Sequence, residues 1–220
     1  MQQPTDIYSR LMVAFGPQGW WPADTPFEVI VGAVLTQNTN WRNVEKAIAN
    51  LKSAGVLTPS TLWQLSATEL AELIRPSGYF RIKAQRLRNV VEYLMQRHSG
   101  STDTMFSMDS NQLRRELLAI NGVGPETADS ILLYAGNQPH FVVDAYTQRV
   151  VQRHGWVAQG ATYEATQRFF TAKLDTDVSC FNEFHALIVK LAKVHCRKAP
   201  LCQGCPLESV LPPEGPRGLV

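Results

Sequence analysis

Two glycines flank a valine in Gly122-Val123-Gly124, between an apolar helical run and a second helical segment. Pro125 follows, and proline is well tolerated at a first helical position because its missing N–H would have no helical partner there. The sequence therefore predicts two helices joined by a short hairpin, with bare backbone N–H groups beside the positive end of the second helix. Such a hairpin is suited to binding one phosphate through backbone groups.

Two carboxylates follow this hairpin. Asp144 comes after the apolar run 141–143 and before a helical sequence, so it is well placed as an N-cap. At the mouth of a cleft the same carboxylate can stabilise a developing positive charge, and it can orient or deprotonate a water molecule. Both roles are compatible. Glu126 lies in the first turn after the hairpin, where an acid interacts favourably with the helix dipole.

The elements that must position these groups are predicted to be short helices. Asn40 is a good N-cap for a helix that runs to about Ala54, and Ser66 with Glu69 matches a capping box. No convincing run of alternating strand residues is present, so the expected fold class is all-α. An apolar stripe at helical spacing consists of Leu87, Val90, Val91 and Leu94.

Composition bounds the class of protein. The 220 residues are 45% hydrophobic and 18% charged, which is enough for a sizeable core in one domain or two closely joined lobes. The net charge of +2 does not by itself suggest nucleic acid, and the basic runs at 81–88 and 190–198 are also typical of solvated helix faces. No secretory signal or membrane-spanning run is visible, and four cysteines do not suggest a disulfide scaffold. The expectation is a soluble cytoplasmic protein with no membrane partner.

The segment LLAINGVGPETA (117–128), followed by FVVDAY (141–146), resembles the helix-hairpin-helix DNA glycosylases of the endonuclease III superfamily. The resemblance extends from about Trp20 to Cys205. It implies a two-lobed all-α fold with the active-site cleft between the lobes, a monomer, and double-stranded DNA with a damaged base as partner. It also implies that Asp144 serves cleavage of the N-glycosidic bond. By position, the hairpin contacts to DNA would come from Gly122, Val123, Gly124 and Thr127.

The same resemblance sets the expected lobes. The terminal helical lobe would comprise residues 1–22 and 137–211, and it would carry Asp144 and the cysteine region. The helical barrel lobe would comprise residues 23–136 with the helix-hairpin-helix. Residues 212–220 hold three prolines and two glycines and are predicted to be a disordered tail.

Three tryptophans point toward the substrate. Trp20 and Trp21 precede Pro22, and Trp41 follows LTQNTN, which is similar to the 3-methyladenine glycosylase branch, where such aromatics surround the flipped base. Alkylated purines carry positive charge on the ring, and cation–π attraction to desolvated aromatics is worth about 1–2 kcal/mol. The alternative is that these tryptophans pack the lobes.

Glu126 departs from part of the family. Members that also nick DNA carry a lysine there, whose amine forms a Schiff base with the sugar. A glutamate cannot form an imine, so the chain is expected to be a monofunctional glycosylase in which water is the nucleophile. Glu126 is then counted with Asp144 as a catalytic candidate and is expected near the pocket lined by Trp20, Trp21 and Trp41. Two alternatives stay open: an oxidised-pyrimidine or mismatch glycosylase of the same fold, and a non-catalytic DNA-binding protein.

Base flipping leaves a gap in the stack, which something must fill. By position in the family, the plugs would be Asn38, with Gln37 beside it, and Tyr79. Arg81 and Lys83 would reach phosphates near the kink. The alternatives are a polar helix end for Asn38 and a half-buried core aromatic for Tyr79.

Three cysteines form an incomplete cluster motif. The family often ends in Cys-x6-Cys-x2-Cys-x5-Cys, which holds a [4Fe–4S] cluster, whereas Cys196, Cys202 and Cys205 stand as Cys-x5-Cys-x2-Cys and Leu211 takes the fourth position. Tight cluster binding normally needs four protein ligands. The expectation is a lost or weakly held cluster that catalysis does not require; a zinc site completed by His195 is the weaker alternative.

Overall fold

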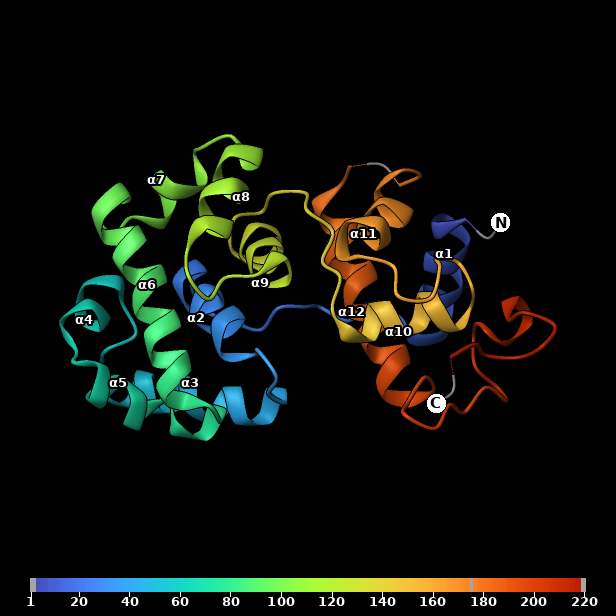
Figure 1. Ribbon diagram of the computed structural model, residues 1–220, viewed down its shortest axis with the longest axis horizontal. Helices are drawn as coiled ribbons and strands as arrows, with labels where there is room; N and C mark the ends of the chain where they lie inside the picture. Colours follow the sequence, from blue (N-terminus) through green and yellow to red (C-terminus); the bar gives the residue numbers. More distant parts are fainter. Residues whose placement is uncertain (1–2, 175, 219–220) are drawn as a thin grey trace. The chain divides into compact units, whose positions relative to one another are not determined.

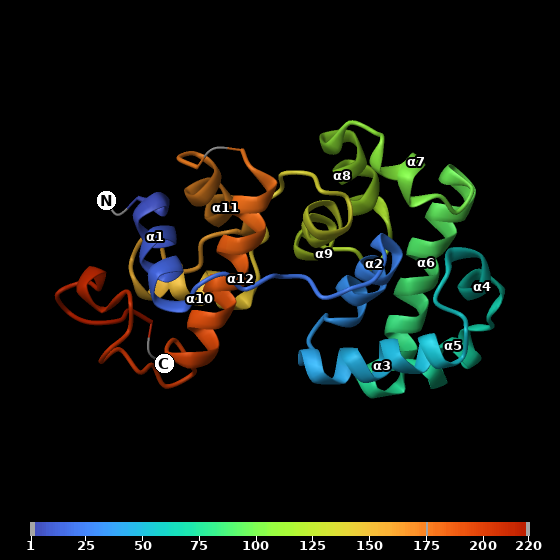
Figure 2. The same cartoon turned by 180° about the vertical axis from the view of Figure 1, so that it is seen from behind.

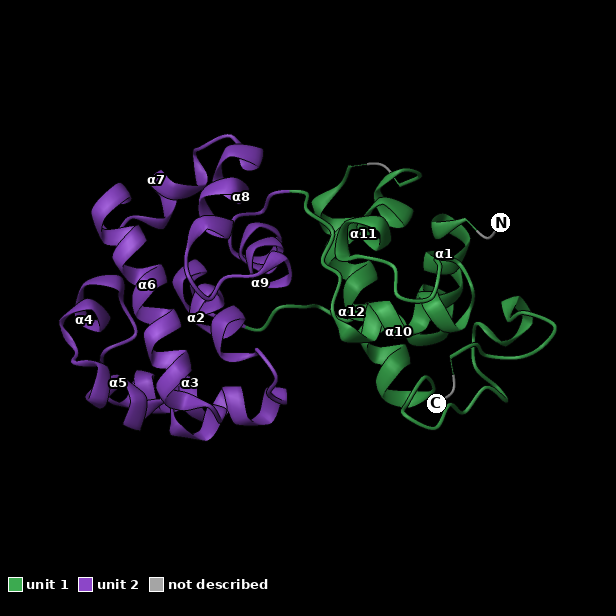
Figure 3. Cartoon of the chain, in the orientation of Figure 1, with its two compact units in different colours: residues 1–22, 139–220 green, residues 23–138 purple. Residues whose placement is uncertain are grey.

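The computed structural model describes residues 3–174 and 176–218, and every regular element in that part of the chain is helical. The chain divides into two compact units, residues 1–22 with 139–220 (unit 1) and residues 23–138 (unit 2), shown in Figure 3. Residues 137 and 138 therefore belong with the preceding helices, two positions beyond the expected boundary. The reason is that Gln138 donates from its backbone to Leu132 O at 2.9 Å and from its side chain to Phe106 O at 3.0 Å.

Unit 2 is built around α2 (Pro26–Leu35), of which residues 27–35 are all buried. The expected caps at Asn40 and Ser66 are confirmed, because both side chains accept a backbone N–H at their helix starts, and Asp109 does the same at the start of α8. The other elements of unit 2 are α3 (Trp41–Ser53), α4 (Pro59–Gln64), α5 (Ala67–Leu73), η1 (Arg75–Ser77), α6 (Phe80–His98), α7 (Thr102–Phe106), α8 (Ser110–Ala119), α9 (Pro125–Ser130) and the π-helical turn η2 (Ile131–Ala135), labelled in Figure 1.

Unit 1 is built around α12 (Val178–Val194), which packs against α1 (Pro4–Phe15) and α10 (Ala145–Arg153). Figure 2 shows these helices from behind. α11 (Tyr163–Thr171) and η3 (Glu208–Val210) complete the unit. The core is aromatic: the Phe141 ring stacks on Phe170 at 4.2 Å between centroids and meets the edges of Phe181 and Phe184. This cluster anchors the extended residues 141–143 that lead into α10.

The expected disordered tail is wrong for residues 212–218. The backbone N–H of Arg217 donates to Arg153 O at 2.9 Å, and the Arg217 guanidinium lies where a side chain on Gly155 would stand. A segment rich in proline and glycine has no hydrophobic core of its own, which is why the sequence predicts disorder. Here the contacts with Arg153 and Gly155 hold the segment on unit 1 instead. Residues 219–220 lie outside the described part. No helix among the described residues has the length and apolar character needed to cross a membrane.

Candidate active site

Asp144 is the N-cap of α10, as the sequence predicts. Its Oδ1 accepts the backbone N–H of Thr147 at 2.7 Å, and its Oδ2 lies 3.6 Å from Nε2 of His185 on α12. The Asp144 side chain is only 15% exposed and that of His185 only 6%. The carboxylate is thus fixed by its own helix on one oxygen and faces a buried imidazole with the other.

This environment favours the ionised form of Asp144. Burial by itself would raise the pKa of the carboxyl. Electrostatic attraction to His185, 3.6 Å away, and the hydrogen bond from Thr147 outweigh burial, so the pKa of Asp144 lies below its ordinary value. A mostly buried carboxylate that stays ionised can stabilise positive charge or orient a water molecule.

The glycine hairpin lies in unit 2 between α8 and α9, with Gly124 as N-cap and Pro125 as the first residue of α9. Gly122 has φ +95°, and a Cβ there would lie 2.3 Å from Cγ of Arg86, so only glycine fits this close approach. The expectation that Val123 offers a free N–H is wrong, because that group donates to Ile120 O at 3.0 Å within the hairpin.

Two residues predicted to contact DNA instead join parts of unit 2. The side-chain amide of Gln37 donates to Gly122 O at 3.0 Å and to Thr127 Oγ1 at 2.9 Å, and its Oε1 accepts from Arg86. Thr127 is buried. The roles of Gln37 as a stack-filling residue and of Thr127 as a DNA contact are therefore corrected, since their polar groups are already used within the protein.

Lys83 is also misassigned by the sequence. Its side chain is 1% exposed, and its ammonium donates to Leu35 O at 2.8 Å, to Ser77 O at 2.7 Å and to the Thr39 hydroxyl. Burial, with the charge of Arg86, lowers the pKa of Lys83 to about 8. It cannot reach a phosphate, because the helical spacing of the basic run turns this position toward the interior.

Asn38, Tyr79 and Arg81 are exposed, in accord with their predicted contact with DNA. Tyr79 is 71% exposed, which excludes the half-buried core alternative. Asn38 and Tyr79 both have left-handed backbones, with φ of +53° and +46°. Such conformations are uncommon outside glycine and place a side chain at the tip of a turn.

The tryptophans fall in both units. In unit 1, Trp20 and Trp21 are half-buried and meet edge to face at 5.7 Å, and Lys193 Nζ lies 5.8 Å from the Trp20 ring centre. Trp41 is the first residue of α3 and packs against the core of unit 2. Within its own unit, Trp41 thus has the packing role that the sequence left open.

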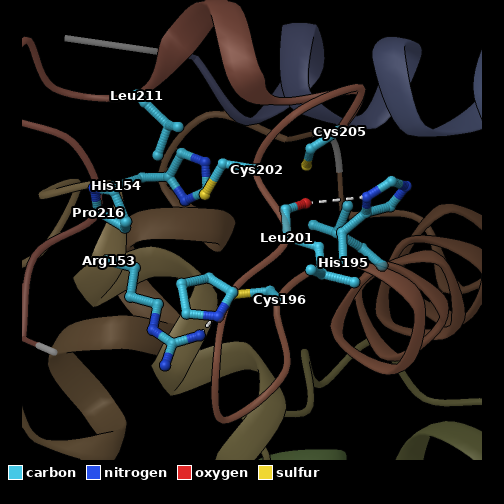
Figure 4. A pocket seen from close by; sticks show the side chains of 11 residues that line it. Arg153, His154, His195, Cys196, Leu201, Cys202, Cys205, Leu211 and Pro216 are labelled. Atoms are coloured by element: carbon cyan, nitrogen blue, oxygen red, sulfur yellow. Dashed lines mark hydrogen bonds between the residues drawn. The ribbon is translucent and has the colours of Figure 1, made fainter. Parts of the chain in front are cut away.

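The three cysteines of the cluster motif line one pocket of unit 1 with Leu211 (Figure 4). Among the described residues, no group of three or more possible ligands is arranged to hold a metal ion. Arg153 donates to Cys196 Sγ at 3.3 Å, and burial raises the pKa of the Cys202 and Cys205 thiols. With the apolar Leu211 at the fourth position, these three cysteines do not supply the four thiolates that a [4Fe–4S] cluster normally takes.

Glu126 is exposed in the first turn of α9 in unit 2, whereas Asp144 lies in unit 1. Two further residues were not singled out as site residues. No sequence motif near His185 indicates that it faces Asp144, because the two residues lie far apart along the chain. Arg86 belongs to the basic run at 81–88, but the sequence does not reveal that its guanidinium binds the Gln37 side chain.

Comparisons with known proteins agree with this architecture. Residues 31–175 match the family described as HhH-GPD superfamily base excision DNA repair protein. A Methanocaldococcus jannaschii protein provisionally named a DNA repair glycosylase is 47% identical over 92% of each chain. Endonuclease III of Thermotoga maritima is 31% identical over 84% of this chain and 81% of its own.

Solved structures show the same fold. The H. pylori 3-methyladenine DNA glycosylase, solved with 1,N6-ethenoadenine, has a TM-score of 0.76 and 27% identity over 87% of this chain and 98% of its own. A non-covalent endonuclease III–DNA complex has a TM-score of 0.81 and 22% identity over 96% of each chain. The chain belongs to the HhH-GPD superfamily of base excision DNA repair proteins, the helix-hairpin-helix DNA glycosylases.

Proposed function

We propose that this protein is a monofunctional DNA glycosylase that flips alkylated purines out of double-stranded DNA and releases them, with 3-methyladenine as the best single substrate. The observation that carries the proposal is the buried carboxylate of Asp144, kept ionised by His185 and Thr147 at the start of α10. Capping α10 accounts for one oxygen of this carboxylate, but gripping the DNA backbone does not need its other oxygen to face a buried imidazole.

Asp144 acts on the bond between base and sugar. As the base leaves, positive charge grows on the deoxyribose, and the ionised carboxylate stabilises that charge. The same group orients or deprotonates the water that attacks the sugar. An alkylated purine already carries positive charge and leaves more easily, so this chemistry needs no metal or other cofactor.

Two observations support water as the nucleophile. Glu126 stands where family members that nick DNA carry a lysine, and a carboxylate cannot form an imine. Lys83 is buried and donates to three oxygens of unit 2, so it does not replace that lysine. The product is then an abasic site rather than a broken strand.

The choice of alkylated purines rests on the aromatic residues. Trp20 and Trp21 offer large π faces in unit 1, whereas Trp41 packs on the core of unit 2. Cation–π attraction selects a positively charged ring in such surroundings. The likeness to the H. pylori 3-methyladenine glycosylase extends over nearly all of that chain, which supports the same substrate class here.

A second candidate is a glycosylase for oxidised pyrimidines or mismatches. It is favoured by the sequence identity to endonuclease III of Thermotoga maritima, which at 31% is higher than the 27% identity to the H. pylori enzyme.

The deciding experiment incubates the protein with duplexes that each contain one lesion: 3-methyladenine, 1,N6-ethenoadenine, thymine glycol or a G·T mismatch. Alkali then converts abasic sites to strand breaks, and samples without alkali report lyase activity. We expect breaks only after alkali and the fastest release from the alkylated purine. Faster release of thymine glycol would establish the second candidate instead.

A further inference from the structure

One side of α6 is polar and contacts three loops of unit 2. Lys83, Arg86 and Asn89 follow one another at intervals of three residues, so they lie along one side of the helix. Five apolar residues of the same helix are buried in the core: Ala84, Leu87, Val90, Val91 and Leu94. Each of these three polar side chains hydrogen-bonds to a residue in a loop of unit 2.

Lys83 joins two of these loops. Its ammonium donates to Leu35 O at the end of α2, to Thr39 in the following loop and to Ser77 O in η1. The Thr39 hydroxyl also donates to Ser77 O at 2.5 Å. The loop at 36–40 and the turn at 77–79 are therefore joined through the buried ammonium of Lys83.

Arg86 and Asn89 join the glycine hairpin to the same group. Arg86 binds the Gln37 side chain, which in turn donates to Gly122 O and Thr127, and the Arg86 stem lies against Gly122. Asn89 donates to Asn121 O at 2.9 Å. Three loops that are distant in sequence are thus fastened to a single helix.

The tips of the first two loops carry exposed residues in strained conformations. Asn38 and Tyr79 both have positive φ, which costs a non-glycine residue free energy and persists only when the surroundings enforce it. The bonds made by Lys83 and Thr39 lie one or two residues from Tyr79 and Asn38 and supply that constraint.

We propose that Lys83, Arg86 and Asn89 are positioning residues that hold the loop at 36–40, the turn at 77–79 and the glycine hairpin in one DNA-binding arrangement before DNA arrives. The inference rests on the proposed function, since DNA is the common ligand of the three loops. Ordering the loops in advance favours the flipped, productive complex over the initial DNA complex, because less conformational freedom is lost when the base is flipped.

The test separates binding from base flipping. Lys83→Met keeps the aliphatic stem and removes the ammonium, and Arg86→Met removes the bond to Gln37. Lys46→Met is the matched control, because Lys46 is exposed on α3 in the same unit. Each variant is assayed for duplex affinity, for 2-aminopurine fluorescence beside a lesion, and for single-turnover base release.

We expect both α6 variants to lose about tenfold or more in base release and most of the fluorescence gain, since small misplacement costs up to about 10²-fold. Their Kd for the duplex should change less than about threefold, because phosphate contacts dominate affinity. Lys46→Met should match the parent in all three measurements.

A double-mutant cycle completes the test and does not depend on the fully buried lysine. Gln37→Leu and Arg86→Met should each lower base release as much as the double variant does, because both break the same Arg86–Gln37 connection. Full base flipping by every variant overturns the positioning role. So does a loss of base release that comes with equally weakened duplex affinity and a lowered melting temperature, because that pattern indicates a general loss of folding. If the parent protein neither flips nor releases any lesion base, it is the proposed function that fails.

Discussion

At the scale of single residues, Asp144 has two tasks that share one geometry. As N-cap it accepts the Thr147 N–H, and as proposed catalyst it presents its other oxygen toward His185. The capping bond fixes the rotamer of the carboxylate, so local helix chemistry already orients the group that the reaction needs.

Replacing this carboxylate should stop the chemistry while leaving DNA binding. Asp144→Asn removes the charge but keeps a capping oxygen, so we expect base release to fall by roughly 10²–10⁴-fold. Duplex affinity and its salt dependence should stay near those of the parent, because they depend on phosphate contacts. Release at the parental rate in the alkali assay would refute the assignment.

His185 should control the pH at which Asp144 works. His185→Asn removes the charge that lowers the pKa of Asp144, and burial then raises that pKa. Because the ionised carboxylate is the active form, the acid limb of the kcat/KM profile should move to higher pH, with a larger loss in acid than at neutral pH.

The control for this experiment is His154→Asn, which removes another buried histidine of unit 1, at the C-terminal end of α10. Its acid limb should match that of the parent. An unmoved acid limb in His185→Asn would show that His185 only packs against α10.

Glu126 leads to a prediction about covalent intermediates. A lysine amine is needed to form an imine with the sugar, and borohydride would trap that imine as a stable adduct. With Glu126 at this position and Lys83 buried, we expect no trapped adduct on denaturing gels. Endonuclease III serves as the positive control, and an adduct with this protein would identify another amine as nucleophile.

At the scale of elements, the tryptophans of unit 1 and unit 2 should behave differently. Trp41 packs on the core of unit 2, so Trp41→Ala should lower the melting temperature. Trp21→Ala should lower release of 3-methyladenine about tenfold or more, since stacking is worth about 1–3 kcal/mol per base and 1.36 kcal/mol is a factor of ten.

The melting temperature of Trp21→Ala decides between pocket and core. A variant that keeps its melting temperature and loses activity lines the pocket. If Trp20→Ala and Trp21→Ala each lose both together, these residues pack unit 1 and the case for alkylated purines is lost with them.

At the scale of the whole molecule, the loop after α12 is held by protein contacts. Arg153 donates to Lys198 O at 2.9 Å and to Cys196 Sγ, and Arg149 donates to Cys196 O at 2.7 Å. These two guanidiniums of α10 fasten the segment that a cluster would otherwise organise. Stability of unit 1 should therefore not depend on iron.

Purified protein should lack stoichiometric iron and the brown colour of a cluster. Iron analysis after anaerobic purification checks this, and about four irons per chain would contradict it. Leu211→Cys restores the fourth position of the motif and should take up more iron on anaerobic reconstitution than the parent. Equal uptake would mean that position 211 is not the missing ligand site.

The sequence by itself determined the all-α class, the caps at Asn40, Ser66 and Asp144, and the hairpin before Pro125. Each of these depends on neighbours within a few residues, and local hydrogen bonding follows from residue type and spacing. The family also followed from short motifs, because the hairpin and the aspartate after an apolar run are both local patterns.

Only the tertiary structure decided which polar residues face inward. Lys83 looked like one more member of a basic surface run, and its burial became visible only when Leu35 and Ser77 supplied acceptors from other segments. Gln37 and His185 follow the same rule, since their partners lie far along the chain. Residue type specifies what a side chain can bind, whereas the packing of distant segments determines what it meets.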